Sequence, residues 1–110
     1  METKRDDKKF SVFLIEFFGT AIITYAFCVT SNIAQYFSAL DVTLVMMLLA
    51  WNVSGGHFNP TITIGVFVSE RKFGAQLVTM LTMIVSQFAG AAFGILLAYL
   101  VLINKDYMKY

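Results

Sequence analysis

The stretch Ser54-Gly55-Gly56-His57-Phe58-Asn59-Pro60 interrupts a chain that is mostly apolar from Phe10 to Ile103. Two adjacent glycines and a proline cannot continue a membrane-spanning helix. The apolar block that follows, residues 61–68, would span about 12 Å as a helix, which is less than half of a hydrocarbon core of about 30 Å. The stretch therefore predicts a loop that enters the membrane and continues into a half-length helix.

Three longer apolar blocks surround this loop, and each is long enough to cross a membrane as a helix. Hydrophobic residues make up 58% of the 110-residue chain and charged residues only 14%, whereas soluble domains carry about 25%. Only Glu16 and Asp41 carry charge between the polar clusters at residues 2–9, 70–72 and 105–109. The sequence predicts an all-α membrane protein with spans at about 10–33, 36–53 and 73–103 and a re-entrant loop with a half-helix at 54–69. The apolar run 10–29 is also longer than the core of a signal peptide, which is about 7–15 residues.

The distribution of basic residues predicts the orientation of these spans. Residues 1–9 are polar and are expected to form a short cytoplasmic, solvated arm that precedes the membrane domain at 10–110. If the loop enters and leaves on one side, six basic residues lie in the cytoplasm and two outside, as the positive-inside rule requires. The six are Lys4, Arg5, Lys8, Lys9, Arg71 and Lys72, and the two are Lys105 and Lys109.

The residue types in the loop suit a path for hydrogen-bonding molecules. Pro60 fits the first turn of a helix, where its missing N–H costs nothing. Asn59 is then expected to cap that helix with its side-chain oxygen, which leaves its two amide hydrogens as outward donors. Gly55 and Gly56 let the backbone expose carbonyl oxygens without side chains in the way. The pattern predicts a row of acceptors that ends at a donor, with the positive end of a helix dipole behind it.

Three segments carry a resemblance to a known family. The loop Ser54 to Thr63 resembles the first signature loop of the aquaporin family, the major intrinsic proteins. Glu16-Phe17-Phe18-Gly19-Thr20 is similar to the motif of the family's first helix, and Ser86-Gln87-Phe88-Ala89-Gly90-Ala91 to that of its third. The resemblance covers nearly the whole chain but only half of the family's six-span fold, so it implies half of an aquaporin-like pore.

The resemblance also assigns expected roles to individual residues. Gly55, Gly56, His57, Asn59, Pro60 and Thr61 are the expected pore-lining signature loop. Threonine stands at position 61, where the family usually has alanine. Ala39 is the expected constriction residue, twenty positions before the asparagine, where water-selective members carry a bulky aromatic residue. The second loop of the family and the arginine that follows its second motif have no counterpart in these 110 residues.

Two polar residues have competing interpretations. By resemblance, Glu16 accepts hydrogen bonds from the backbone of the 54–59 loop and braces it; the alternative is a carboxylate that snorkels to the interface. His57 is expected to line the pore or brace the loop, because a single histidine and a single cysteine, Cys28, supply too few ligands for a metal site. We therefore expect no metal, no cofactor and no catalytic residue.

Small and polar residues on the last span indicate close helix packing. Ser86, Gly90, Gly94 and Ala98 recur every four residues, a spacing typical of tight contacts between membrane helices. Gln87 and Gly19 are expected to face protein as well. The pattern leaves open whether the contact is within the chain or between subunits.

Two functions follow from these features. The first is a membrane channel that passes water or a small neutral solute such as glycerol, as a half-pore that needs a second half or another membrane subunit. The second is a non-conducting structural subunit derived from such a channel. An enzyme is not expected, and the expected partners are the lipid bilayer and the solute, with no nucleic acid, because the basic residues form no continuous patch.

Overall fold

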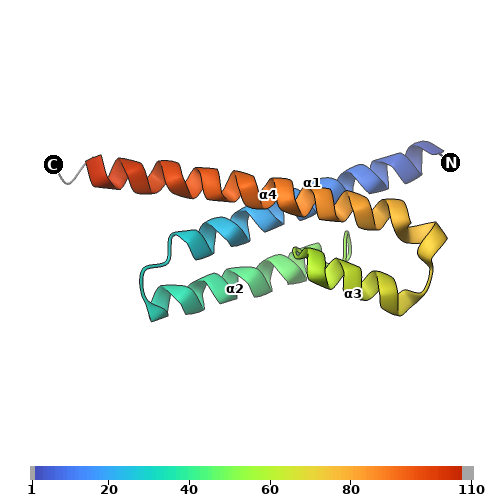
Figure 1. Ribbon diagram of the computed structural model, residues 1–110, viewed down its shortest axis with the longest axis horizontal. Coiled ribbons are helices and arrows are strands. Elements are labelled where there is room, and N and C mark those ends of the chain that lie inside the picture. Colours follow the sequence, from blue (N-terminus) through green and yellow to red (C-terminus); the bar gives the residue numbers. More distant parts are fainter. Residues whose placement is uncertain (1, 108–110) are drawn as a thin grey trace.

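The protein consists of four helices, seen in a computed structural model that describes the backbone of residues 2–107 and the side chains of residues 7–105 (Figure 1). The helices are α1 Glu2–Cys28, α2 Ile33–Ala50, α3 Pro60–Glu70 and α4 Phe73–Tyr107. The molecule is elongated, with extents of 57 × 26 × 19 Å. Segments of α1, α2 and α4 are long and apolar enough to cross a membrane, whereas the 11 residues of α3 extend only about 16 Å. This arrangement confirms the predicted fold class, three membrane helices and one short helix.

The helix ends differ by several residues from the predicted spans. α1 begins at Glu2, so residues 2–9 continue the first helix and do not form a separate arm. It ends at Cys28, before a turn in which Asn32 caps α2 by accepting a hydrogen bond from the Gln35 N–H. α2 ends at Ala50 and α4 continues to Tyr107. Hydropathy shows which residues can lie in the hydrocarbon core of the membrane, whereas a helix ends at its cap or at a turn. The ends of the apolar segments and the ends of the helices therefore do not coincide.

α1 and α4 cross in close contact at the centre of the molecule (Figure 1). The contact depends on two glycines of α4. A Cβ at Gly90 would overlap the carbonyl oxygen of Phe17, and a Cβ at Gly94 would overlap that of Ala21. These glycines therefore let the two backbones touch, as small residues do between membrane helices. The contact that the sequence left unassigned is made within the chain.

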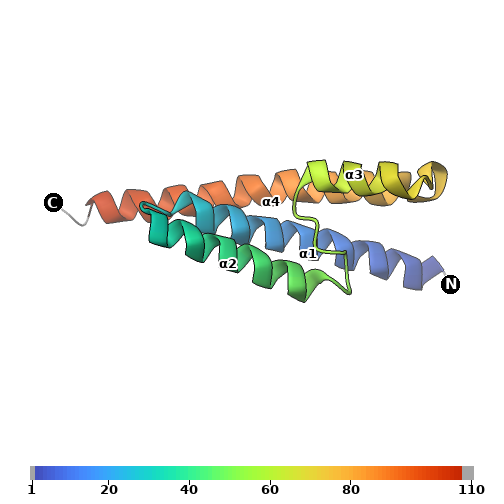
Figure 2. The ribbon, with the colours of Figure 1, turned by 90° about the horizontal axis from the view of Figure 1, so that it is seen from below.

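The course of the chain explains how a short helix fits into a membrane protein. The start of α1 and the connection between α3 and α4 lie at one end of the molecule, while the α1–α2 connection and the end of α4 lie at the other (Figures 1 and 2). The loop between α2 and α3 lies between these ends, beside α1. The chain therefore turns inside the molecule, and α3 then runs toward the end where α1 begins. This is the course of a re-entrant segment.

The glycine contact predicts a specific sensitivity to a single methyl group. Gly90→Ala is expected to destabilise the protein by about 1–3 kcal/mol, because the methyl group meets the backbone of α1, which cannot move aside as a side chain could. Gly74→Ala is the matched control: the same change near the start of the same helix, with nothing within 4 Å of the new Cβ. Thermal unfolding in detergent measures both. Equal melting of the two variants would contradict the close packing of α1 and α4.

Candidate functional site

The loop between α2 and α3 adopts a backbone that only particular residues allow. Gly55 and Gly56 have φ values of +86° and +64°, a region in which glycine meets no steric cost. A Cβ at Gly56 would lie 2.8 Å from the carbonyl oxygen of Met47 on α2. Both the conformation and the lack of space therefore require glycine at position 56.

The carboxylate of Glu16 lies at the centre of this loop's hydrogen bonds. Glu16 is fully buried on α1. Its Oε1 accepts from the Ser54 hydroxyl at 2.5 Å and from the His57 N–H at 3.2 Å, and its Oε2 accepts from the Phe58 N–H at 2.8 Å. The Ser54 hydroxyl in turn accepts from the Gly56 N–H at 3.2 Å. One side chain of α1 thus satisfies, directly or through Ser54, three successive backbone donors of the loop.

A second set of hydrogen bonds ties the loop to α3 and α4. Gln87, buried on α4, donates from Nε2 to Glu16 Oε2 at 2.9 Å and to the hydroxyl of Thr63 at 2.8 Å. The Thr63 hydroxyl also lies 3.2 Å from the Asn59 carbonyl and 3.1 Å from His57 Nδ1. Both amide hydrogens of Gln87 are used, which fixes the orientation of that amide.

The Thr63 hydroxyl joins three groups of the site with a single hydrogen. It accepts from the Gln87 amide and lies within hydrogen-bond distance of the Asn59 carbonyl and of His57 Nδ1. Its hydrogen goes to one of these two, and if it goes to the Asn59 carbonyl, the contact with His57 is made by an Nδ1–H donor. Thr63 thus links the loop, α3 and α4 at one atom.

The half-helix α3 begins as its sequence predicts. Asn59 has extended backbone angles and its side-chain oxygen accepts from the Thr61 N–H at 2.8 Å, while Pro60 occupies the first turn. The residues Asn59 and Thr61 are exposed. Within the described part of the chain, the amide hydrogens of Asn59 make no hydrogen bond, so they remain available as donors at the positive end of α3.

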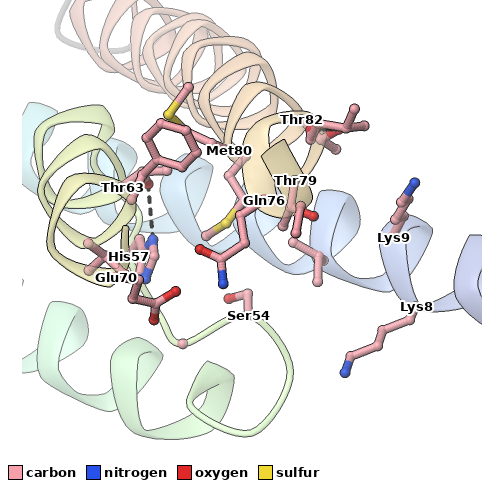
Figure 3. Close-up of a pocket in the computed structure, with 17 residues that line it drawn as sticks. Lys8, Lys9, Ser54, His57, Thr63, Glu70, Gln76, Thr79, Met80 and Thr82 are labelled. Carbon is pink, nitrogen blue, oxygen red and sulfur yellow. Dashed lines mark hydrogen bonds between the residues drawn. The ribbon is translucent and has the colours of Figure 1, made fainter. Parts of the chain in front are cut away.

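The loop borders a cleft of about 730 Å³ between α1, α3 and the first half of α4 (Figure 3). His57 and Ser54 line it on the loop side, and Gln76 and Thr79 line it on α4. The remaining labelled polar residues in Figure 3 are Lys8, Lys9, Glu70, Thr63 and Thr82. The cleft therefore offers several donors and acceptors beside an otherwise apolar wall that includes Val12, Val66 and Met83.

Three of the remaining predicted residues occupy different environments. Gly19 lies against the ring of Phe58, and a Cβ at this position would overlap the ring. Gly19 therefore provides the space in which this loop side chain packs against α1. Gly90 lies against α1, as described above. Ala39 is only 2% exposed, so its methyl group is covered by this chain and is not presented on an open surface. Its role as a constriction residue stays a prediction.

Two residues of the site were missed by the sequence analysis. Phe58 has a φ of +51°, a strained value for a residue with a side chain, and its buried ring rests on Gly19. Thr63 is buried and joins the loop, α3 and α4. Its position four residues after the helix cap was a usable signal, because such a hydroxyl reaches back to the capping residue's carbonyl. Nothing local in the sequence indicates the conformation of Phe58.

Comparison with known proteins agrees with this geometry. The sequence profile of the family described as "Major intrinsic protein" matches residues 9–109. Aquaporin Z of Brucella melitensis biotype 1 is 28% identical over an alignment of 103 residues, and the match covers 83% of this chain and 44% of that protein. The chain thus spans less than half of the length of that curated relative. No solved structure matches the sequence.

Replacing Glu16 tests whether its carboxylate organises the loop. Glu16→Leu leaves the His57 and Phe58 N–H groups and one amide hydrogen of Gln87 without acceptors, at about 1–3 kcal/mol for each buried donor. Glu16→Gln keeps one acceptor oxygen and is expected to melt between the wild type and the leucine variant. Glu70→Leu removes an exposed glutamate and is expected to change stability by no more than about 0.5 kcal/mol. If Glu16→Leu melts in detergent like the wild type, the carboxylate does not hold the loop.

Proposed function

The chain belongs to the major intrinsic protein family, and from this membership and the geometry of its loop we propose that it forms half of a channel for water or a small neutral solute. Proteins of this family are channels and not enzymes, and this chain is an integral membrane protein with several spans. Conduction requires a lumen that one re-entrant loop borders on one side only. We therefore propose that a second half, from another polypeptide or another part of the same protein, completes the pore.

This proposal rests on a difference between the two kinds of backbone group in the loop: the N–H groups of three successive residues are hydrogen-bonded within the described chain, whereas the carbonyl oxygens of the same residues are not. The N–H groups of Gly56, His57 and Phe58 are used on the side of Glu16. Among the described residues, no hydrogen bond ends on the carbonyl oxygens of residues 54–58. Non-helical backbone at membrane depth is tolerated where it is buried in protein or lines a water-filled path. Free carbonyl oxygens in such a segment suit water or hydroxyl groups of a passing solute.

Asn59 supplies the donor that complements these acceptors. Its oxygen is held by the first turn of α3, so its amide hydrogens face away from the helix. The N-terminus of α3 adds a positive partial charge, equivalent to about half an elementary charge in a long helix. A neutral molecule that both donates and accepts can bind the carbonyls and Asn59 in turn, whereas a cation is repelled at the helix end.

The proposed orientation places the N-terminus in the cytoplasm. The beginning of α1, whose sequence includes Lys8 and Lys9, lies at the same end of the molecule as the α3–α4 connection, which consists of Arg71 and Lys72. Basic residues gathered at one end of a set of spans favour the cytoplasmic side for that end. The side chains of Lys4, Arg5 and Lys109, which also entered the sequence count, lie outside the described residues.

A non-conducting structural subunit is the second candidate. Threonine at position 61 favours it, since the family usually has alanine after the proline. The hydrogen bonds of Glu16, Thr63 and Asn59 favour a loop kept in a conducting geometry. Flux measurements on the completed complex decide between the two.

Substitution of Asn59 separates capping from conduction. Asn59→Asp keeps the capping oxygen but replaces the amide donors with a second oxygen. The variant is therefore expected to fold like the wild type, while the flux of neutral solutes falls or cations enter the channel. Asn59→Ala removes both functions and is expected to cost about 1 kcal/mol in addition. The measurement is solute and cation flux in vesicles that contain this chain with the subunit or segment that completes it.

Asn52→Asp is the matched control, because Asn52 is an exposed asparagine in the turn after α2 and caps no helix. A complex that conducts with unchanged flux and selectivity when Asp stands at position 59 contradicts the pore assignment of Asn59. A wild-type complex that never conducts supports the structural subunit.

Labelling of single cysteines tests the orientation. A cysteine at Lys72 in a Cys28→Ser background is expected to react with a membrane-impermeant thiol reagent only after the membrane is opened. The native Cys28 is exposed at the opposite end of α1 and is expected to react from outside in intact cells. Labelling of position 72 from outside while Cys28 is protected would reverse the proposed orientation, and labelling of both positions from one side would contradict the re-entrant course.

A further inference from the structure

The imidazole ring of His57 is held at two opposite edges. Its Nδ1 atom lies 3.1 Å from the hydroxyl of Thr63 on α3. Its other edge lies against Gly55, where a Cβ would come within 3.2 Å of Nε2 and 3.5 Å of Cδ2. All three residues line the cleft beside α4 (Figure 3). The position of the ring therefore depends on the hydroxyl of Thr63 at one edge and on the space left by glycine at the other.

The contacts of the Thr63 hydroxyl favour one arrangement of hydrogens. A hydroxyl group has one hydrogen to donate and can accept two hydrogen bonds. Gln87 occupies one acceptor position, because its amide nitrogen can only donate. If His57 carries a hydrogen on Nδ1, that hydrogen occupies the second position, and the hydroxyl donates to the Asn59 carbonyl. All three neighbours of Thr63 are then hydrogen-bonded.

The opposite arrangement leaves two groups without a bond. If Nδ1 has no hydrogen, it takes the hydroxyl hydrogen of Thr63, and the Asn59 carbonyl faces the hydroxyl oxygen at 3.2 Å with no hydrogen between them. The ring hydrogen then lies on Nε2, where no hydrogen bond is made within the described chain. An N–H group without a partner is rarer inside proteins than an acceptor with spare capacity. Both comparisons favour a hydrogen on Nδ1.

We propose that Thr63 is a positioning residue that holds neutral His57 in the form with hydrogen on Nδ1, so that Nε2 is an acceptor on the loop side of the cleft. In histidine, the hydrogen bond made by one ring nitrogen decides which of the two carries the hydrogen. The carbonyl oxygens of residues 54–58 are acceptors of the same loop. His57 thus adds a side-chain acceptor to that row, and Asn59 remains its donor.

The consequence for transport rests on the proposed channel function. A molecule that passes the loop must donate a hydrogen bond at His57 and accept one from Asn59. Molecules with O–H or N–H groups, such as water or a small alcohol, do both, whereas solutes that carry acceptors only find no partner at His57. The position of the ring hydrogen, however, is a property of the folded chain and is measured without any flux.

Nuclear magnetic resonance of the imidazole nitrogens tests the proposal directly. The chain contains one histidine, so every imidazole signal belongs to His57. In the full chain, labelled with ¹⁵N-histidine and purified in detergent, nitrogen shifts and long-range proton couplings show which ring nitrogen carries the hydrogen. At alkaline pH, where imidazole groups are ordinarily neutral, the wild type is expected to carry it on Nδ1. Free histidine in water prefers Nε2, so the expected result differs from that of an unanchored ring.

Three variants test whether Thr63 sets this form. Thr63→Val keeps the shape but removes the hydroxyl, and the ring hydrogen is expected to move mainly to Nε2. Thr63→Ser keeps the hydroxyl and is expected to retain the hydrogen on Nδ1. Thr82→Val is the matched control: Thr82 also lines the cleft, but its hydroxyl donates to the Val78 carbonyl at 2.8 Å. This variant is expected to leave the His57 signals unchanged.

Several results would overturn the proposal. A wild type with its ring hydrogen on Nε2 does so by itself, even if Thr63→Val fails to fold. A folded Thr63→Val variant that keeps the hydrogen on Nδ1, or a Thr63→Ser variant that loses it, would show that the hydroxyl does not set the form. A completed complex that never conducts would refute the proposed channel but leave the assignment of His57 intact.

Discussion

The carboxylate of Glu16 meets a constraint that every polar loop inside a membrane faces. Backbone N–H groups at that depth have no water to bind, and each unsatisfied donor costs several kcal/mol in hydrocarbon. Here one buried side chain accepts from two backbone N–H groups, a serine hydroxyl and the Gln87 amide. The irregular backbone between α2 and α3 is thereby stable without adopting a helix.

The packing of α1 against α4 serves the same purpose. Gly90 and Gly94 remove the side chains that would hold the two helices apart, and Gln87, one turn away, then reaches Glu16 and Thr63. Gly19 makes room on α1 for the ring of Phe58, so the loop rests on the helix that also binds its backbone. The close approach of α1 and α4 thus also positions the groups that bind the backbone donors of the α2–α3 loop.

The two acidic residues within the apolar spans show how environment decides the role of a carboxylate. Glu16 is surrounded by donors from the loop and from α4, and it is fully buried in the chain. Asp41 has the same chemistry on a face of α2 that nothing in the described chain covers. The first completes the interior of this chain, and the second lies on a face of α2 that the described residues leave open. Both follow from the cost of a charged group in hydrocarbon.

The sequence alone determined the features that depend on neighbouring residues. Gly55, Gly56 and Pro60 predicted where a helix must stop, the eight apolar residues after Pro60 predicted a half-length helix, and Asn59 was placed correctly as its cap. A backbone break, a short apolar run and a cap are local properties, so a short stretch of sequence is enough to predict them.

The family resemblance predicted the contact of Glu16 with the 54–59 loop, but only the tertiary structure decided which other distant groups meet. The donors of Glu16 lie up to 71 residues away, at Gln87, and no periodicity in the sequence pairs them. The contact of Phe58 with Gly19, the junction at Thr63 and the packing of the glycines of α4 against the same chain also depend on how the helices assemble. Even the helix ends differ from the predicted spans, because hydropathy shows which residues suit the membrane interior whereas caps and turns decide where a helix ends. Contacts of this kind arise from the close approach of whole helices, a property that no single segment contains.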